Sequence, residues 1–159
     1  MKKVWMLCFG IILIFSLAAC AGKSDSKPAS NSANPDLRLQ VKFEKIEAKI
    51  NDEITCRVEA ARVGFRGYGM MLAEIGIPPG AEVDRSSLQA ALKDWTITQY
   101  NVLPDRVVVY LWPRAGGVSF NFKFRPRFGL HAKTAASTLY DYYNPEAAVV
   151  VPPSVFTVR

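Results

Sequence analysis

Cysteine and histidine side chains are the groups in this sequence best suited to nucleophilic or metal chemistry. They are Cys8, Cys20, Cys56 and His131. A Cys–His pair needs its thiol beside the imidazole. Cys56, however, is expected to point into the core from a strand that lies far along the chain from His131. No metal-ligand spacing occurs, and no inward pair of carboxylates is evident. The sequence therefore predicts no enzyme, no cofactor and no metal site.

Cys20 has a context that predicts a different chemistry. It ends the stretch Leu-Ala-Ala-Cys, after a basic start and an apolar run too short to span a bilayer comfortably as a helix. This layout resembles a bacterial lipobox, in which the cysteine thiol takes a diacylglycerol before the signal is cut. Several acyl chains give a stable anchor. We expect residues 1–19 to be a lipoprotein signal peptide and Cys20 to be the lipid attachment site. An ordinary cleaved signal is the alternative.

The residues around the cleavage site also predict where the protein resides. Ala21, rather than an aspartate, follows Cys20, and in enteric-type bacteria this implies sorting to the outer membrane. Residues 21–35 are all small, polar or proline, so we expect residues 20–35 to form the lipidated cysteine and a flexible tether. Such a tether reaches about 20 Å. We therefore expect a protein of the bacterial cell envelope, anchored in the outer membrane.

Residues 36–159 remain for folding, which is one domain of ordinary size. Cys56 is its only cysteine, so no disulfide within the domain is expected. Loss of Lys2 and Lys3 with the signal lowers the net charge from +6 to +4. This mild excess favours solubility and does not indicate a nucleic-acid partner.

Apolar residues recur with a period of two along most of this region. The alternation over 37–43, 54–60 and 118–125 predicts half-buried strands, and Cys56 falls on the buried side. A phase shift predicts a bulge near Lys45. Further strands are expected within 70–77, 95–101, 105–112, 137–143 and 146–151. With turn signals between them, about eight strands predict a mainly β fold, an antiparallel two-sheet β-sandwich.

One short inserted helix interrupts the strands. Asp84 is a suitable N-cap. Leu88, Ala91, Leu92 and Trp95 have the spacing of a narrow apolar stripe that would pack on the sandwich.

The order of several short motifs resembles a known family. Gly69-Met70 begins a strand that stops at Gly80, the helix follows, and Tyr110-Leu111 ends a later strand. The stretch Tyr140–Tyr143 then reads Tyr-Asp-Tyr-Tyr. In this order the motifs resemble the receptor-binding domain at the C-terminal end of alpha-2-macroglobulins, over roughly Leu37 to Phe156. The resemblance implies a β-sandwich that works by protein–protein contact.

The sequence also departs from whole macroglobulins. It is too short for a bait region and has no Cys-Gly-Glu-Gln thioester motif, so the protease-trapping chemistry does not carry over. The chain resembles the terminal domain alone, as a stand-alone bacterial lipoprotein.

The helix is the place where the family resemblance implies a contact site. In the animal proteins two lysines, one helical turn apart, are central to receptor binding, and they match Arg85 and Gln89. Lys93 lies one turn further on. We therefore take Arg85, Gln89 and Lys93 as candidate partner-binding residues. The alternative is a solvated helix face. The tyrosine stretch likewise either seals one end of the sandwich or forms a recognition patch.

These observations favour a lipid-anchored envelope protein whose domain is a protein–protein interaction module. In one version its partner is a separate macroglobulin. The alternative is a cell-wall or carbohydrate-binding module that uses exposed aromatic residues and a basic stretch, and a third hypothesis is a structural accessory. The basic stretch consists of Lys123, Arg125, Arg127, His131 and Lys133. The expected partners are the membrane, through Cys20, and a protein of unknown identity, with no nucleic acid or small-molecule substrate.

Overall fold

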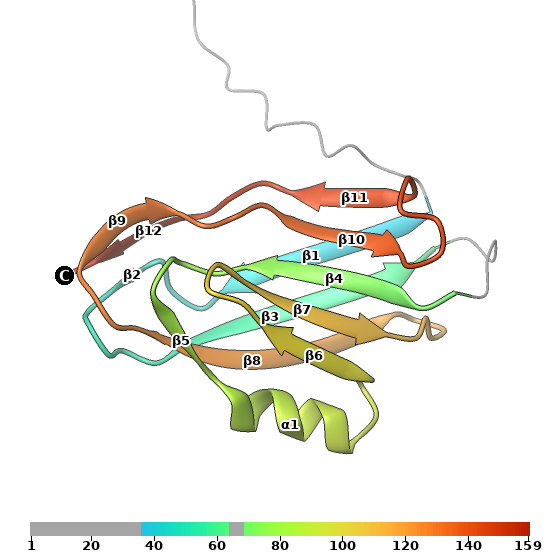
Figure 1. The fold of residues 1–159 in the computed structure, drawn as a ribbon, viewed down its shortest axis with the longest axis horizontal. Helices are drawn as coiled ribbons and strands as arrows, with labels where there is room; N and C mark the ends of the chain where they lie inside the picture. The colour runs from blue at the N-terminus through green and yellow to red at the C-terminus, as the bar shows by residue number, and fades with distance from the viewer. Residues whose placement is uncertain (1–35, 64–68) are drawn as a thin grey trace, which may run out of the picture.

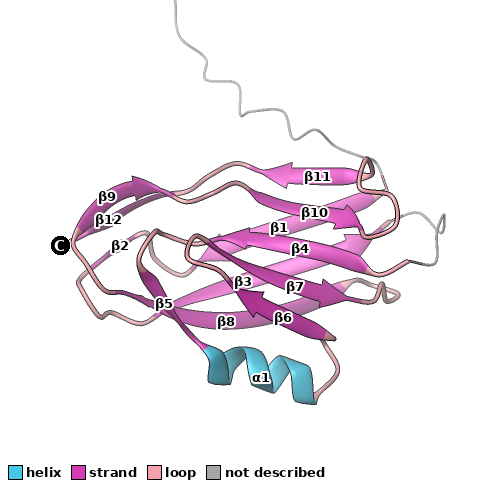
Figure 2. Ribbon diagram, viewed as in Figure 1, coloured by secondary structure: helices cyan, strands magenta, loops and turns pink. Residues whose placement is uncertain are grey.

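A computed structural model describes residues 36–63 and 69–159. The expected signal peptide, Cys20 and the tether lie outside these described residues. Within them the chain forms twelve strands and one helix, which Figure 2 shows at the edge of the molecule. This helix is far too short to cross a membrane, and no other helix is found in the described ranges. The elements are β1 (Leu37–Phe43), β2 (Glu47–Ala48), β3 (Ile54–Arg62), β4 (Met71–Gly76), β5 (Ala81–Asp84), α1 (Arg85–Lys93), β6 (Gln99–Val102), β7 (Arg106–Leu111), β8 (Val118–Pro126), β9 (Leu130–Lys133), β10 (Ser137–Asp141), β11 (Ala148–Val151) and β12 (Val155–Val158).

Two antiparallel sheets form the body of the protein, as the sequence predicted. One sheet has the strand order β1-β3-β8-β5, and the other has the order β11-β10-β4-β7-β6. Every strand pair in both sheets is antiparallel. β5 and β6 are edge strands of different sheets, and α1 connects them along one side of the sandwich (Figure 1).

A third, smaller sheet raises the number of strands above the expected eight. Its order is β2-β12-β9, and β12 pairs with β2 in parallel and with β9 antiparallel. The phase shift near Lys45 has its explanation here. After Phe43 the chain leaves the first sheet and enters the third one at Glu47, so the shift marks a change of sheet rather than a bulge within one strand.

The core lies between the two main sheets and follows the predicted alternation. In β8, Phe120, Phe122 and Phe124 are buried while the residues between them face outward or are half-buried. In β3 the side chain of Cys56 is fully buried, and burial raises the pKa of its thiol. Phe156 of the third sheet packs edge-on against Phe43, with ring centroids 4.9 Å apart, and so joins the small sheet to the main core.

Candidate partner-binding surface at the helix

Local hydrogen bonds set the start of α1. Asp84 is the N-cap, and its Oδ1 accepts hydrogen bonds from the backbone N–H of Ser86 at 2.9 Å and from the Ser86 hydroxyl at 2.6 Å. These bonds from Ser86 lower the pKa of the Asp84 carboxyl. Ser87 Oγ accepts a hydrogen bond from the backbone N–H of Lys123 at 3.0 Å, which ties the first turn to β8. The predicted cap is therefore confirmed, and the helix is fixed to the sandwich from its first turn.

The apolar stripe of the helix is narrower than expected. Leu88 is fully buried and Ala91 is 7% exposed, but Leu92 is 37% exposed and Trp95 is 75% exposed. The helix ends at Lys93, and Trp95 adopts a left-handed backbone conformation with φ of 60°. This turn carries Trp95 away from the core, so the expectation that Leu92 and Trp95 pack inward was wrong.

A residue beyond the helix fills the core position instead. The side chain of Ile97 is 1% exposed, and its backbone N–H donates to the carbonyl oxygen of Ala91 at 3.1 Å. The last turn is thus folded back onto the sandwich by Ile97.

The three candidate contact residues lie on the surface. Arg85, Gln89 and Lys93 are all exposed. None of their side chains forms a hydrogen bond or ion pair with any residue in the described ranges. Arg85 and Lys93 occupy opposite ends of α1, so the stripe runs the length of the helix.

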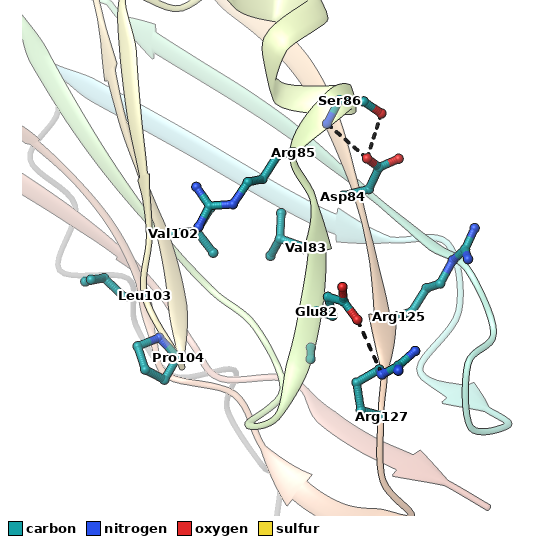
Figure 3. Close-up of a pocket in the computed structure, with 11 residues that line it drawn as sticks. Glu82, Val83, Asp84, Arg85, Ser86, Val102, Leu103, Pro104, Arg125 and Arg127 are labelled. Atoms are coloured by element: carbon teal, nitrogen blue, oxygen red, sulfur yellow. Dashed lines mark hydrogen bonds and ion pairs between the residues drawn. The ribbon is translucent and has the colours of Figure 1, made fainter.

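Arg85 also borders an open groove of about 870 Å³ beside the helix. The groove separates the edge strands β5 and β6, and Figure 3 shows Arg85 directed from the first helical turn toward the β6 side. Arg125 and Arg127 line the β5 side, together with Glu82. Val102, Leu103 and Pro104 supply the opposite wall.

The arginines of the groove differ in their partners. Arg125 pairs with Glu53 at 2.9 Å, and Arg127 pairs with Glu82 at 3.3 Å. Arg85 is the one arginine lining the groove that has no ion-pair partner within 36–63 and 69–159. Its guanidinium is therefore the charge in the groove that remains available for an external carboxylate.

Neighbouring acids neutralise much of the basic stretch noted in the sequence. Glu53 accepts hydrogen bonds from Lys123 at 2.6 Å and from Arg125 at 2.9 Å. These two hydrogen bonds, of which the one from Lys123 has the larger effect, lower the pKa of the Glu53 carboxyl to about 2. His131 Nδ1 lies 3.0 Å from the Thr157 hydroxyl. Lys123, Arg125 and Arg127 of the stretch are thus paired surface charges, which reduces its cationic character.

The tyrosine stretch lies at one end of the sandwich. The Tyr140 hydroxyl donates to Glu74 at 3.2 Å, while the Tyr142 ring contacts the rings of Tyr110 and Tyr143 at centroid distances of 6.3 and 5.2 Å. A Cβ on Gly69 would lie 3.1 Å from Asp141 Oδ1. The close approach explains why a glycine stands before the fourth strand, and it brings two motifs of the family resemblance into contact.

Other chemistry finds little support in the described residues. Cys56 is far from the surface, and no group of three or more histidine, cysteine or acidic side chains in the described ranges could hold a metal ion. The groove itself was not foreseen, because no strand was expected between Gly80 and the helix, where β5 forms one wall. The alternating Glu82 and Val83 were the signal that could have revealed it.

Comparison with known proteins supports the family resemblance. The A-macroglobulin receptor binding domain family matches residues 66–152, which include the helix, the groove wall β6 and the tyrosine stretch. This chain belongs to that family. No curated protein matches the sequence.

Solved structures of bacterial macroglobulins share the fold of this receptor-binding domain. Native Escherichia coli alpha-2-macroglobulin, from domain MG7 to the C-terminus, superposes with a TM-score of 0.67 at 13% identity and covers 80% of this chain and 24% of its own. A Salmonella alpha-2-macroglobulin mutant gives a TM-score of 0.67 at 14% identity and covers 84% of this chain and 10% of its own. The chain thus spans from a tenth to a quarter of the length of these solved proteins.

Proposed function

We propose that this receptor-binding domain is a lipid-anchored module of the bacterial cell envelope that binds another protein through α1 and the adjoining groove. The supporting observation is the row of Arg85, Gln89 and Lys93, which are exposed and carry no side-chain partner in the described part of the chain. The family match spans this row, and the family is named for receptor binding.

The chemistry of the surface favours an acidic face on the partner. Arg85 and Lys93 place a positive charge near each end of the helix, and Arg85 is directed over the apolar wall of the groove. A carboxylate bound by a guanidinium in two parallel hydrogen bonds, next to an apolar contact, gives both affinity and orientation. In the bacterial relatives the same fold is one part of a much longer macroglobulin. A separate macroglobulin of the same envelope is the partner that this comparison favours.

Charge reversal tests the contact surface. Arg85→Glu combined with Lys93→Glu should greatly weaken capture of the partner from solubilised envelope, whereas the melting temperature should stay close to that of the unmodified protein. The matched control is Lys42→Glu with Arg57→Glu. These two exposed, neighbouring cations lie on β1 and β3, and β1 is the sheet edge opposite to β5. Equal capture by both double variants would refute the proposed surface.

The anchor needs a separate experiment. Cys20→Ser should abolish incorporation of a labelled fatty acid and leave either a precursor that keeps residues 1–19 or a soluble product. Cys8→Ser is the control, because Cys8 lies inside the expected signal peptide and takes no lipid. Membrane fractionation then reports the location of the unmodified protein. Equal labelling of the Cys20→Ser variant would contradict lipid attachment at that residue.

A further inference from the structure

The chain enters the sandwich at one end, which we call the entry end. Asp36, the first described residue, accepts a hydrogen bond from the backbone N–H of Val63 at 2.8 Å. Leu37 pairs with Arg62, so β1 starts where β3 ends. Met71 pairs with Leu111, so β4 starts where β7 ends. All four of these strand ends lie at the entry end. The end of β10 lies there as well, because Asp141 pairs with Met71. In Figure 1 this end is on the right, opposite the C-terminus.

Exposed aromatic side chains gather at the entry end. Five aromatic side chains in the described ranges are strongly exposed, and four of them, Trp95, Trp112, Tyr142 and Tyr143, lie here. Trp112 directly follows β7, and the two tyrosines directly follow β10. Arg114 in the turn after β7 donates to the carbonyl oxygen of Trp95, which brings the α1–β6 connection to the same end. The fifth, Phe128, lies at the opposite end, where a Cβ on Gly80 would be 3.0 Å from its ring.

The burial of these side chains shows that they do not serve the core. Trp95 is 75% exposed, Tyr143 is 72% exposed and Trp112 is 52% exposed. Single exposed apolar residues are ordinary on a protein surface, but a cluster of large ones marks a contact site. Tryptophan and tyrosine combine an apolar ring with a polar N–H or O–H group, and they concentrate at the boundary between lipid and water.

The position of the expected anchor identifies what covers this surface. Residues 21–35 join Cys20 to the entry end and reach about 20 Å. A domain held so close experiences the membrane at an effective concentration on the order of millimolar, so a weak surface preference is enough to orient it. Charges at this end are mixed in sign, with Arg38 and Arg114 beside Asp36 and Asp94, and therefore favour the neutral interface over an electrostatic attraction.

We propose that the entry end is a membrane-contact surface, with Trp95, Trp112, Tyr142 and Tyr143 seated among phospholipid headgroups. The proposal rests on the lipid anchor of the proposed function. It also supplies an orientation for that function. The groove ends at Leu103 and Pro104, which precede β7 and lie toward the opposite end of the sandwich. A domain that rests on its entry end thus presents Arg85 and the groove away from the bilayer, where a partner can reach them.

The tryptophans of the mature chain provide a direct test. The sequence has three tryptophans, and Trp5 leaves with the expected signal, so only Trp95 and Trp112 emit in the mature protein. The lipidated chain is reconstituted into vesicles of phosphatidylethanolamine and phosphatidylglycerol, with or without bromine on the acyl chains near the headgroup. We expect bromine to reduce the emission of the unmodified protein. Trp95→Phe and Trp112→Phe, examined singly, report on each ring.

A variant with its only tryptophan at the opposite end is the control. Trp95→Phe, Trp112→Phe and Phe128→Trp together place the single tryptophan on an exposed position there, where Phe128 is 66% exposed. This variant should float with the vesicles and show no bromine quenching. Quenching as strong as that of the unmodified protein would show that the domain has no fixed orientation and would overturn the proposal.

Flotation of the vesicles distinguishes failure of the lipid anchor from failure of the membrane-contact surface. If the unmodified chain does not float, the anchor is absent and both proposals fail. If it floats but bromine leaves its emission unchanged, only the membrane-contact surface is overturned. An emission change with soluble cell-wall fragments, and none with brominated vesicles, would also overturn it and would assign the aromatic cluster to a glycan.

Discussion

Arg62 on β3 and Asp141 at the end of β10 form an ion pair that joins the two sheets of the sandwich. Arg62 Nη2 and Asp141 Oδ2 are 2.5 Å apart, and the two side chains are only 6% and 13% exposed. Asp141 Oδ1 also accepts hydrogen bonds from the backbone N–H groups of Tyr143 at 2.9 Å and Asn144 at 3.2 Å. The aspartate of the Tyr-Asp-Tyr-Tyr stretch thus closes the turn after β10 and links the two sheets at the entry end.

Breaking this pair from either side should be costly. Asp141→Asn or Arg62→Met removes one partner of a buried ion pair, and such changes cost about 3–5 kcal/mol of unfolding free energy. The double variant should cost less than the sum of the two, because neither charge remains. Urea denaturation of all four proteins measures this coupling. Lys45→Met is the control, since the exposed Lys45–Asp52 pair is worth under about 1 kcal/mol. Additive single costs would refute the coupling.

The same carboxyl predicts a dependence of stability on pH. Burial alone would raise the pKa of Asp141, but the hydrogen bonds from Tyr143 and Arg62 outweigh it and hold the pKa below its ordinary value. A carboxyl whose pKa is lowered by folding stabilises the folded state above its unfolded pKa of about 4. That contribution is lost as the pH falls through the lower folded value. The difference in unfolding free energy between the unmodified protein and Asp141→Asn should therefore be constant near neutrality and shrink below a pH of about 4. A difference that grows on acidification would contradict the assigned direction.

The sequence predicts those parts of this fold whose signals are local. Phe120, Phe122 and Phe124 alternate with polar residues because one face of β8 is buried, and the period alone identifies that face. Asp84 could be recognised as a cap because its bonds go to Ser86, two residues along the chain. The exposure of Arg85, Gln89 and Lys93 follows equally from the helical period.

Long-range pairing decides the rest, and no local pattern reveals it. Arg62 and Asp141 are 79 residues apart. β2 has two residues and is defined by its contact with β12, more than a hundred residues later, so neither could be recognised from its own sequence. Trp95 has the right spacing for the apolar stripe, but Ile97 occupies the core and the helix ends before Trp95.

The helix anchor can be tested by truncating its two leucines separately. Leu88→Ala should lower the unfolding free energy by about 2–5 kcal/mol, because the side chain is fully buried and leaves a cavity. Leu92→Ala should cost about 1 kcal/mol or less, because the side chain is already 37% exposed. Thermal and urea unfolding of both variants gives the comparison. A larger cost for Leu92 than for Leu88 would mean that the faces of α1 are assigned wrongly.

Cys56 should be unreactive in the folded protein. Its side chain is fully buried and burial raises the pKa of the thiol, so both access and the thiolate fraction are low. A maleimide or disulfide reagent should leave Cys56 of the Cys20→Ser variant unmodified under native conditions and react with it in denaturant. Cys20→Ser with Ser119→Cys is the positive control, because Ser119 lies on the exposed side of β8. Native labelling of Cys56 at the rate of the control would contradict the inward orientation of this part of β3.

Gly76 at the end of β4 should tolerate no side chain. A Cβ there would lie 2.0 Å from the carbonyl oxygen of Ala135, and the backbone N–H of Gly76 donates to the Ser137 hydroxyl at 3.0 Å. Gly76→Ala must therefore push β4 away from the chain that leads into β10, at a cost of about 1–3 kcal/mol or more. Gly129→Ala is the matched control, since its Cβ would meet only the Val158 carbonyl oxygen at 3.5 Å and the change should stay within about 0.5 kcal/mol. Urea unfolding measures both. An unfolding free energy of Gly76→Ala equal to that of Gly129→Ala would show that β4 and Ala135 are not in close contact in solution.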